Sequence, residues 1–285
     1  MIDRSGRPGS TRRLRDSGAR RHWRRWGLVL AALALVAADA RPPERFDTIV
    51  IDAGHGGEDE GARGPAGSVE KSVALGVTRA LAGRLRSRGL RVVMTREDDV
   101  FVPLEQRTAL ANDARGDLFV SIHANAARDS KIRGIETYFL ALDASDASAE
   151  ALARRENSAF SGAGADSIAA IDDPFIALIG DLITTEYLQE SNEFAGLVQQ
   201  ELAAGAPAHS RGVKQALFVV LAGVQMPAAL VEVGFITNAE DERELAGAKG
   251  RGKLVDALER AVLAFGRRYD ARRGAAPAAG GAEHQ

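Results

Sequence analysis

The sequence contains no cysteine, which excludes disulfide bonds and thiolate chemistry, so any metal ion must be held by histidines and carboxylates. Beyond the N-terminus, acidic residues outnumber basic ones. Residues 1–40 hold nine of the 37 Lys and Arg residues and three of the 39 acids, leaving 28 bases against 36 acids, a net charge of −8. A surface that follows phosphates needs a basic patch. We therefore expect no nucleic-acid partner.

The apolar run near the N-terminus is too short for an ordinary membrane span, which needs about 20 residues. It covers Gly27 to Ala38, follows an arginine-rich start and precedes the small-residue site Ala38-Asp39-Ala40. These three parts predict that residues 1–40 are a signal peptide for export, followed by a linker at 41–46. An uncleaved membrane anchor is the alternative. Paired arginines leave both the Sec and the twin-arginine routes open.

Beyond the linker, predicted strands and helices alternate along the chain. Buried or β-favouring runs predict strands, and apolar residues at i+4 spacing with a terminating glycine predict helices. The expected strands are 48–52, 91–95, 117–122, 135–140, 216–221 and 228–235; the expected helices are 70–88, 104–114, one around 192–204, and two more that close the chain. This alternation predicts a single α/β domain over 47–270, with a mostly parallel central β-sheet and helices on both faces.

Two segments stand outside this alternation. Residues 143–191 form a long interruption rich in Ala, Ser, Asp and Glu, where a connection of about 2–6 residues is usual. Within it, Phe175, Leu178, Ile179 and Leu182 have the spacing of an amphipathic helix. We expect a helical insert at 143–191 and a disordered, Ala/Gly-rich tail at 271–285.

Two histidines stand where predicted strands end. His55 follows the strand 48–52 by three residues, inside a glycine-rich loop, and His123 directly follows residue 122. Ligands of open α/β sheets lie beyond the carboxyl ends of the strands, so both imidazoles are expected at one edge. Glu70 opens the next helix and can fold back towards them. Two imidazoles, one carboxylate and a water suit a catalytic zinc site, although each residue alone has an ordinary structural explanation.

A carboxylate is predicted inside the apolar strand 228–235. Glu232 lies between Val231 and Val233. Burying a carboxylate is costly unless it is paired or functional. A structural glutamate paired with an arginine and a proton acceptor beside the metal fit the sequence equally well. Asn125, two residues after His123, could contact a substrate or form a turn.

Four motifs resemble those of the zinc-dependent N-acetylmuramoyl-L-alanine amidases of the bacterial cell wall, the Amidase_3 family. They are IVIDAGHGG with His55, SVEKSVAL with Glu70, SIHANA with His123 and LVEVGFITN with Glu232, in this order within residues 47–268. MTREDDVFVPLEQRTALAN, RGIETYFL and RGVKQALFVV also fit the family pattern. The resemblance implies that His55, Glu70 and His123 ligate Zn²⁺. It implies that Glu232 acts as general base and then acid in hydrolysing the bond between N-acetylmuramic acid and L-alanine in peptidoglycan.

Some members of this family that separate daughter cells carry a comparable insert, whose helix blocks the zinc until a partner withdraws it. The resemblance thus implies autoinhibition by residues 143–191, a LytM-type activator, and an exported enzyme of the periplasm or cell-wall compartment. The blocking acid would be Glu150, Glu156, Glu186 or Glu190. We expect a monomer. Two alternatives are a zinc peptidase acting within the stem peptide and a non-catalytic wall-binding domain; the four intact motif residues argue against the latter.

Overall fold

A six-stranded β-sheet forms the centre of the protein. The computed structural model describes residues 45–158, 185–205 and 209–274. The strands are β1 (Thr48–Ala53), β2 (Arg91–Met94), β3 (Leu118–Asn125), β4 (Ile135–Leu140), β5 (Ser210–Ala216) and β6 (Ala228–Phe235). Their order is β2-β1-β3-β6-β4-β5; β2, β1, β3 and β6 are parallel, while β4 is antiparallel to β6 and parallel to β5. The mostly parallel sheet is therefore confirmed.

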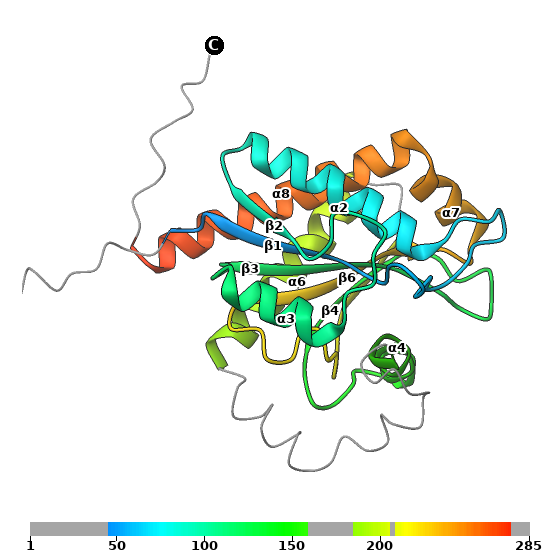
Figure 1. The fold of residues 1–285 in the computed structure, drawn as a ribbon, viewed down its shortest axis with the longest axis horizontal. Helices are drawn as coiled ribbons and strands as arrows, with labels where there is room; N and C mark the ends of the chain where they lie inside the picture. Colours follow the sequence, from blue (N-terminus) through cyan, green and yellow to red (C-terminus); the bar gives the residue numbers. More distant parts are fainter. Residues whose placement is uncertain (1–44, 159–184, 206–208, 275–285) are drawn as a thin grey trace, which may run out of the picture. The chain divides into compact units, whose positions relative to one another are not determined.

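Helices cover both faces of this sheet (Figure 1). They are α2 (Glu70–Ser87), α3 (Leu104–Asp113), α4 (Ala147–Asn157), α6 (Thr185–Gly205), α7 (Ala239–Ala246) and α8 (Ala248–Arg272). One face packs against α2, α6 and α8, and the other packs against α3 and α4. Among the described helices, none is long and apolar enough to cross a bilayer. A single α/β domain with two covered faces is the predicted fold class.

The alternating directions of strand side chains build two apolar cores. In β1, Ile49 and Ile51 join the core under α2, α6 and α8, whereas Val50 joins the core under α3 and α4. All of β1, β3 and β6 is buried, because helices cover both sides of a parallel sheet. The central strands are thus held firmly, and they carry the residues that the sequence singles out.

One predicted strand is wrong, and other bounds shift. The strand expected at 216–221 is a turn-rich segment, and β5 ends at Ala216. Phe218 and Leu221 are apolar because they fill the core beside α3 and α4, without pairing in the sheet. β3 runs three residues further than expected, so His123 lies within it. α8 includes residues 271 and 272 of the expected tail. The helix predicted around 175–182 lies outside the described residues.

Candidate metal centre

The loop after β1 presents His55 in an unusual backbone conformation. His55 has φ of +58°, in the left-handed region that residues with a side chain seldom adopt. The buried Arg107 guanidinium holds this turn by donating to the carbonyl oxygens of His55 (2.8 Å) and Ala53 (2.6 Å). Arg107 is itself paired with Asp52 at 2.8 Å. The strained backbone of His55 is therefore held by a guanidinium group from α3.

Two glycines make room for the candidate ligands. A Cβ atom on Gly54 would lie 2.4 Å from Cε1 of the His123 ring. Gly61 has φ of +65°, and a Cβ there would lie 2.6 Å from Glu70 Oε2 and 2.7 Å from His55 Cδ2. Any larger residue would collide with these side chains. The loop is glycine-rich at these positions because the backbone closely approaches the site.

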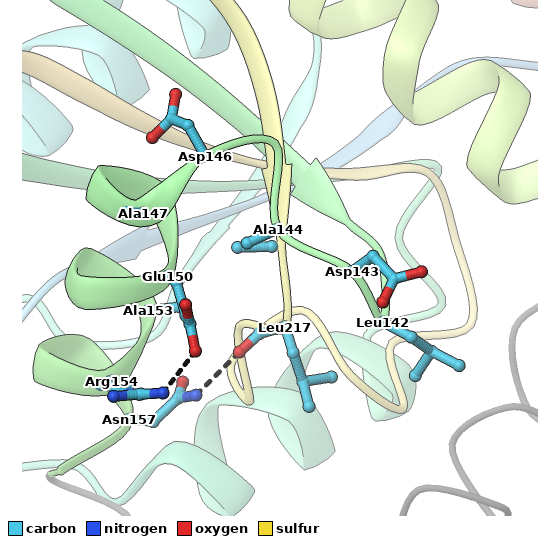
Figure 2. Close-up of a pocket in the computed structure, with 11 residues that line it drawn as sticks. Leu142, Asp143, Ala144, Asp146, Ala147, Glu150, Ala153, Arg154, Asn157 and Leu217 are labelled. Atoms are coloured by element: carbon cyan, nitrogen blue, oxygen red, sulfur yellow. Dashed lines mark hydrogen bonds and ion pairs between the residues drawn. The ribbon is translucent and has the colours of Figure 1, made fainter.

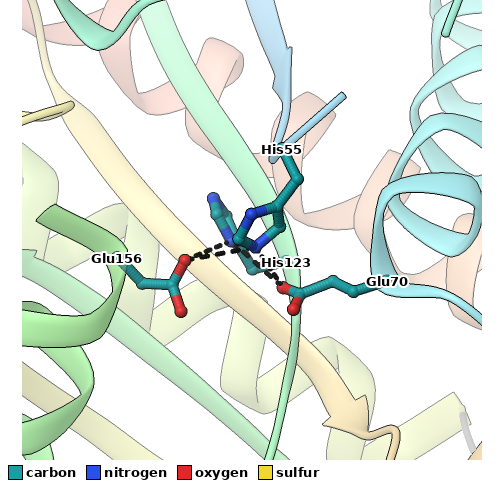
Figure 3. A group of neighbouring side chains, drawn as sticks. All are labelled: His55, Glu70, His123 and Glu156. Atoms are coloured by element: carbon teal, nitrogen blue, oxygen red, sulfur yellow. Dashed lines mark hydrogen bonds and ion pairs between the residues drawn. The ribbon is translucent and has the colours of Figure 1, made fainter. Parts of the chain in front are cut away.

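The three ligands expected from the sequence come together, and a fourth side chain joins them (Figure 3). His55 Nε2 lies 3.0 Å from Glu70 Oε1 and 3.3 Å from Glu156 Oε2. His123 Nδ1 lies 3.2 Å from Glu70 Oε1 and 3.0 Å from Glu156 Oε2. The four ligand atoms all lie within 4.8 Å of one another. We call these four residues the ligand cluster.

The ligand cluster has the geometry and chemistry of a zinc site. Tetrahedral Zn²⁺ with bonds of about 2.0–2.1 Å separates its ligand atoms by roughly 3.3 Å, close to the spacings above. His55 Nε2 and Glu156 Oε2 are buried and make no hydrogen bond within the described part of the chain, despite their short separation. Both atoms therefore remain available to a metal ion. Two imidazole nitrogens and two carboxylate oxygens are donors that zinc accepts.

The charges of the ligand cluster favour a cation. Burial by itself would lower the pKa of His123, but the Glu156 carboxylate raises it to about 10. Burial would raise the pKa of Glu70, but the charge of His55 lowers it to about 2. Without a metal ion, protons on the imidazoles thus balance the carboxylates. A metal ion would replace those protons, as ligand deprotonation on metal binding requires.

Backbone and side-chain groups outside the ligand cluster orient its members. His55 Nδ1 lies 2.9 Å from Asp59 Oδ2, which leaves Nε2 for the metal. Ala124 N donates to Glu70 Oε1 at 3.0 Å, and Ala62 N donates to Glu70 Oε2 at 2.8 Å. Sequence reasoning missed Asp59. Its signal is an acid four residues after the histidine in the same loop.

Glu232 lies beside the ligand cluster with an unpaired carboxyl group. It is fully buried on β6, directly across from His123 on β3. Neither carboxyl oxygen has a hydrogen-bond partner within the described residues, and burial raises its pKa well above the ordinary value. The β3–β6 register shifts just after this pair, and such irregularities are common next to active sites. The structural alternative, a glutamate bound to an arginine, does not describe this side chain.

Of the four acids proposed to reach the metal, Glu156 is the one that lies in the ligand cluster. Glu150 is exposed and pairs with Arg154 on the same helix (Figure 2). Glu190 pairs with Arg272 and Arg273 on and after α8. The side chain of Glu186 lies outside the described part. The sequence could not separate these acids, because their distance from the metal depends on how the insert folds.

Helix α4, which carries Glu156, is fastened at both ends. At its start, Asp146 accepts from Ala149 N at 2.8 Å and pairs with Lys214 at 3.2 Å. At its end, Asn157 Nδ2 donates to Leu217 O at 2.7 Å, which Figure 2 shows, and Asn157 Oδ1 accepts from Val219 N at 2.8 Å. Three residues of its inner face are buried in the core: Ala149, Leu152 and Ala153.

A cluster able to hold a metal ion, with a buried unpaired carboxyl group beside it at the carboxyl ends of central parallel strands, fits a metal-dependent hydrolase of the α/β class. The comparisons specify this class further. The family model described as N-acetylmuramoyl-L-alanine amidase, Amidase_3, matches residues 49–264. The chain belongs to this family.

Relatives and solved structures agree with this placement. The chain is 36% identical over 223 residues to the N-acetylmuramoyl-L-alanine amidase AmiA of Escherichia coli K12, covering 78% of this chain and 77% of the relative. It is 35% identical over 222 residues to AmiC of Neisseria meningitidis, covering 78% and 53%. The solved amidase AmiC2 of Nostoc punctiforme is 28% identical, with a TM-score of 0.58 over 78% of this chain and 98% of that chain.

Proposed function

We propose that this amidase uses zinc to hydrolyse the bond between N-acetylmuramic acid and L-alanine in peptidoglycan. The observation that carries the proposal is the convergence of His55, Glu70 and His123 beside the buried, unpaired Glu232. The first three side chains would hold the zinc ion. When bound, zinc would polarise the scissile carbonyl group and make water more acidic.

Glu232 would carry the proton during hydrolysis. As a base, its carboxylate takes a proton from the attacking water, and as an acid it returns that proton to the nitrogen of the leaving L-alanine. Burial supports this role because it raises the pKa of Glu232 towards the range of a proton shuttle. Ala124 N and Ala62 N would keep Glu70 oriented throughout.

The insert would make this enzyme autoinhibited. Glu156 on α4 lies within 3.3 Å of His55 Nε2 and 3.0 Å of His123 Nδ1, and with zinc bound it would take the position that a catalytic zinc site leaves for water or substrate. We infer that α4 must leave before peptidoglycan can bind, and that a LytM-type activator acting on residues 143–191 withdraws it during daughter-cell separation. Residues 1–40 would act as a signal peptide that exports the monomeric enzyme to the periplasm or cell-wall compartment. Support for export, activator and monomer comes from sequence and family resemblance.

Mass spectrometry of products released from purified sacculi tests the reaction. The zinc-loaded Glu156→Gln variant should release intact stem peptides that begin with L-alanine, and adding Glu232→Gln should lower the rate by at least about 100-fold. Shortened peptides still attached to glycan would instead identify a peptidase on the same site. Sacculi that are bound but not cut would identify a wall-binding domain.

Comparison of Glu156→Gln with the unaltered chain tests autoinhibition. We expect faster hydrolysis together with weaker zinc binding, because the substitution removes one candidate ligand and opens its position. Glu150→Gln, on the exposed side of the same helix, is the matched control and should change neither quantity. Faster hydrolysis with unchanged zinc affinity would place Glu156 outside the metal site. A point substitution is preferable to deleting 145–190, which would remove the start of α6 and expose the core under α4.

A further inference from the structure

Arg155, the neighbour of Glu156 on α4, contacts the end of β3. Its NH1 donates to Ala126 O and its NH2 donates to Asn125 Oδ1, both at 3.2 Å. Its Nε pairs with Glu156 at 2.9 Å. Arg155 also lines the open cavity that contains His55 and Glu70. Arg155 therefore contacts both that cavity and two oxygen acceptors, one on the last residue of β3 and one on the residue that follows it.

Asn125 shares a face of β3 with a candidate metal ligand. His123 and Asn125 are two residues apart in one strand, so their side chains leave it in the same direction. Asn125 is buried under Arg155 while α4 is in place. Its amide oxygen would be close to the substrate in a cavity from which α4 had departed.

The orientation of the Asn125 amide is fixed by Glu136 on β4. The Glu136 carboxylate accepts from Asn125 Nδ2 at 2.9 Å and from Tyr138 OH at 2.7 Å. It also pairs with Lys214 (2.9 Å) and Arg211 (3.0 Å). A carboxylate held by two cations is ionised and only accepts, so the NH₂ group of Asn125 must face it. Asn125 Oδ1 must then point the other way, towards Arg155.

We propose that Asn125 Oδ1 and Ala126 O form a binding site for peptide N–H groups of the stem peptide, and that Arg155 occupies this site in the inhibited state. The inference rests on the proposed function. Arg155 and Glu156 together then imitate the substrate: one supplies N–H donors to the β3 acceptors, and the other supplies an oxygen to the metal site. Glu136 is a positioning residue that keeps the acceptor turned towards the substrate.

A substrate amide matches these acceptors in chemistry. In the scissile amide, the carbonyl carbon and the N–H nitrogen are bonded directly to each other, so the carbonyl oxygen and the N–H lie close together. A second N–H follows in the stem peptide. The acceptors lie at the end of the strand that carries His123, so one substrate can reach both the metal site and Asn125. Asn125 Oδ1 also accepts from Ala126 N at 2.7 Å, so removing the arginine would leave Asn125 Oδ1 one hydrogen bond short and Ala126 O without its side-chain donor. A substrate N–H would relieve this cost.

The test uses N-acetylmuramoyl-L-alanyl-D-isoglutamine and two derivatives, each N-methylated at one stem-peptide nitrogen. Calorimetry measures their Kd for the zinc-loaded full chain carrying Glu156→Gln and Glu232→Gln, which prevents turnover. With Arg155→Ala added, the unmethylated ligand should bind about tenfold more tightly, and one methylated form should lose that gain. Adding Asn125→Ala should weaken binding of the unmethylated ligand and abolish its advantage over that methylated form.

Thr237→Val is the matched control, because Thr237 holds the neighbouring Ala127 N at 3.0 Å without touching either acceptor. It should preserve the discrimination between ligands. Equal affinities for all three ligands in the Arg155→Ala protein would overturn the proposal, even if Asn125→Ala failed to fold. Discrimination that survives Asn125→Ala would also overturn it. Hydrolysis of sacculi by Glu156→Gln alone reports separately on the proposed function, so failure of the two ideas can be told apart.

Discussion

At the scale of single residues, the contact between His55 and Asp59 controls which imidazole nitrogen faces the ligand cluster. The Asp59 carboxylate can only accept, so Nδ1 of His55 carries the proton and Nε2 is left as the metal donor. Asp59 Oδ1 also accepts from Gly61 N at 3.2 Å. The same acid therefore orients the ring and holds the loop that makes room for it.

Replacing Asp59 should weaken zinc binding without unfolding the protein. We expect Asp59→Ala to lower zinc affinity about 10–100-fold, as is typical when the orienting partner of a ligand histidine is lost. Competition with a chromophoric chelator measures this affinity. Glu58→Ala is the control, because Glu58 is in the same loop as Asp59 and lines the same cavity as His55. Equal zinc affinities of the two variants would contradict the orienting role of Asp59.

At the scale of elements, α4 is a helix whose inner face and last turn are held by different kinds of contact. Its inner face is part of a core, whereas its last turn is held by Asn157, Arg155 and Glu156. If the insert is inhibitory, as proposed, an activator would need to break only the contacts of that last turn to uncover the ligand cluster, without unfolding the whole helix.

Asn157→Ala should therefore raise basal hydrolysis. The change removes two hydrogen bonds to the segment after β5, each worth about 1 kcal/mol, so the open population should increase by roughly 30-fold. Hydrogen exchange across residues 147–157 should rise in parallel. Arg154→Ala, whose described partner is Glu150 on the same helix, should leave both quantities near those of the unaltered chain. Slow exchange and unchanged hydrolysis in Asn157→Ala would exclude this turn as the releasable end.

Elements whose apolar residues follow the period of a strand or helix could be predicted from the sequence. Segments whose apolar residues fill a core without that regular structure could not. β1 and α2 follow from their patterns because both bury regular faces. Residues 217–221 have the apolar content of a strand but fill a core as turns. His55, Glu70 and His123 could be placed together because parallel strands end at one edge. Glu156 reaches them through the packing of α4, which no local pattern encodes.

At the scale of the whole molecule, Glu232 should lower the stability of the metal-free fold. Burial raises its pKa, so the folded state binds a proton that the unfolded state has lost above about pH 4.3. The folded state then loses stability as pH rises from that value towards the raised pKa. Glu232→Gln removes the titration.

Urea unfolding of chelator-treated protein measures this effect. At pH 7, Glu232→Gln should be more stable than the unaltered chain by on the order of 1 kcal/mol or more, and the difference should shrink towards pH 4. Glu201→Gln is the comparison, because Glu201 on α6 is paired with Arg260. This variant should not gain stability at pH 7. A difference that is constant from pH 4 to 7 would show that burial of the charge is not its cause.

The reversed direction of β4 has a consequence for the resting enzyme. Because β4 runs against β6, the chain leaves β4 at the edge away from the metal, and α4 returns so that its C-terminal end meets the ligand cluster. The C-terminal end of a helix is the negative pole of its macrodipole and attracts cations. With zinc in the ligand cluster, the bond between the ion and Glu156 would also help to hold α4, the proposed inhibitory helix, in place. Metal shortage would then weaken the hold on α4 without ending it, because the contacts of Asp146 and Asn157 and the pairing of Glu156 with His123 need no metal ion.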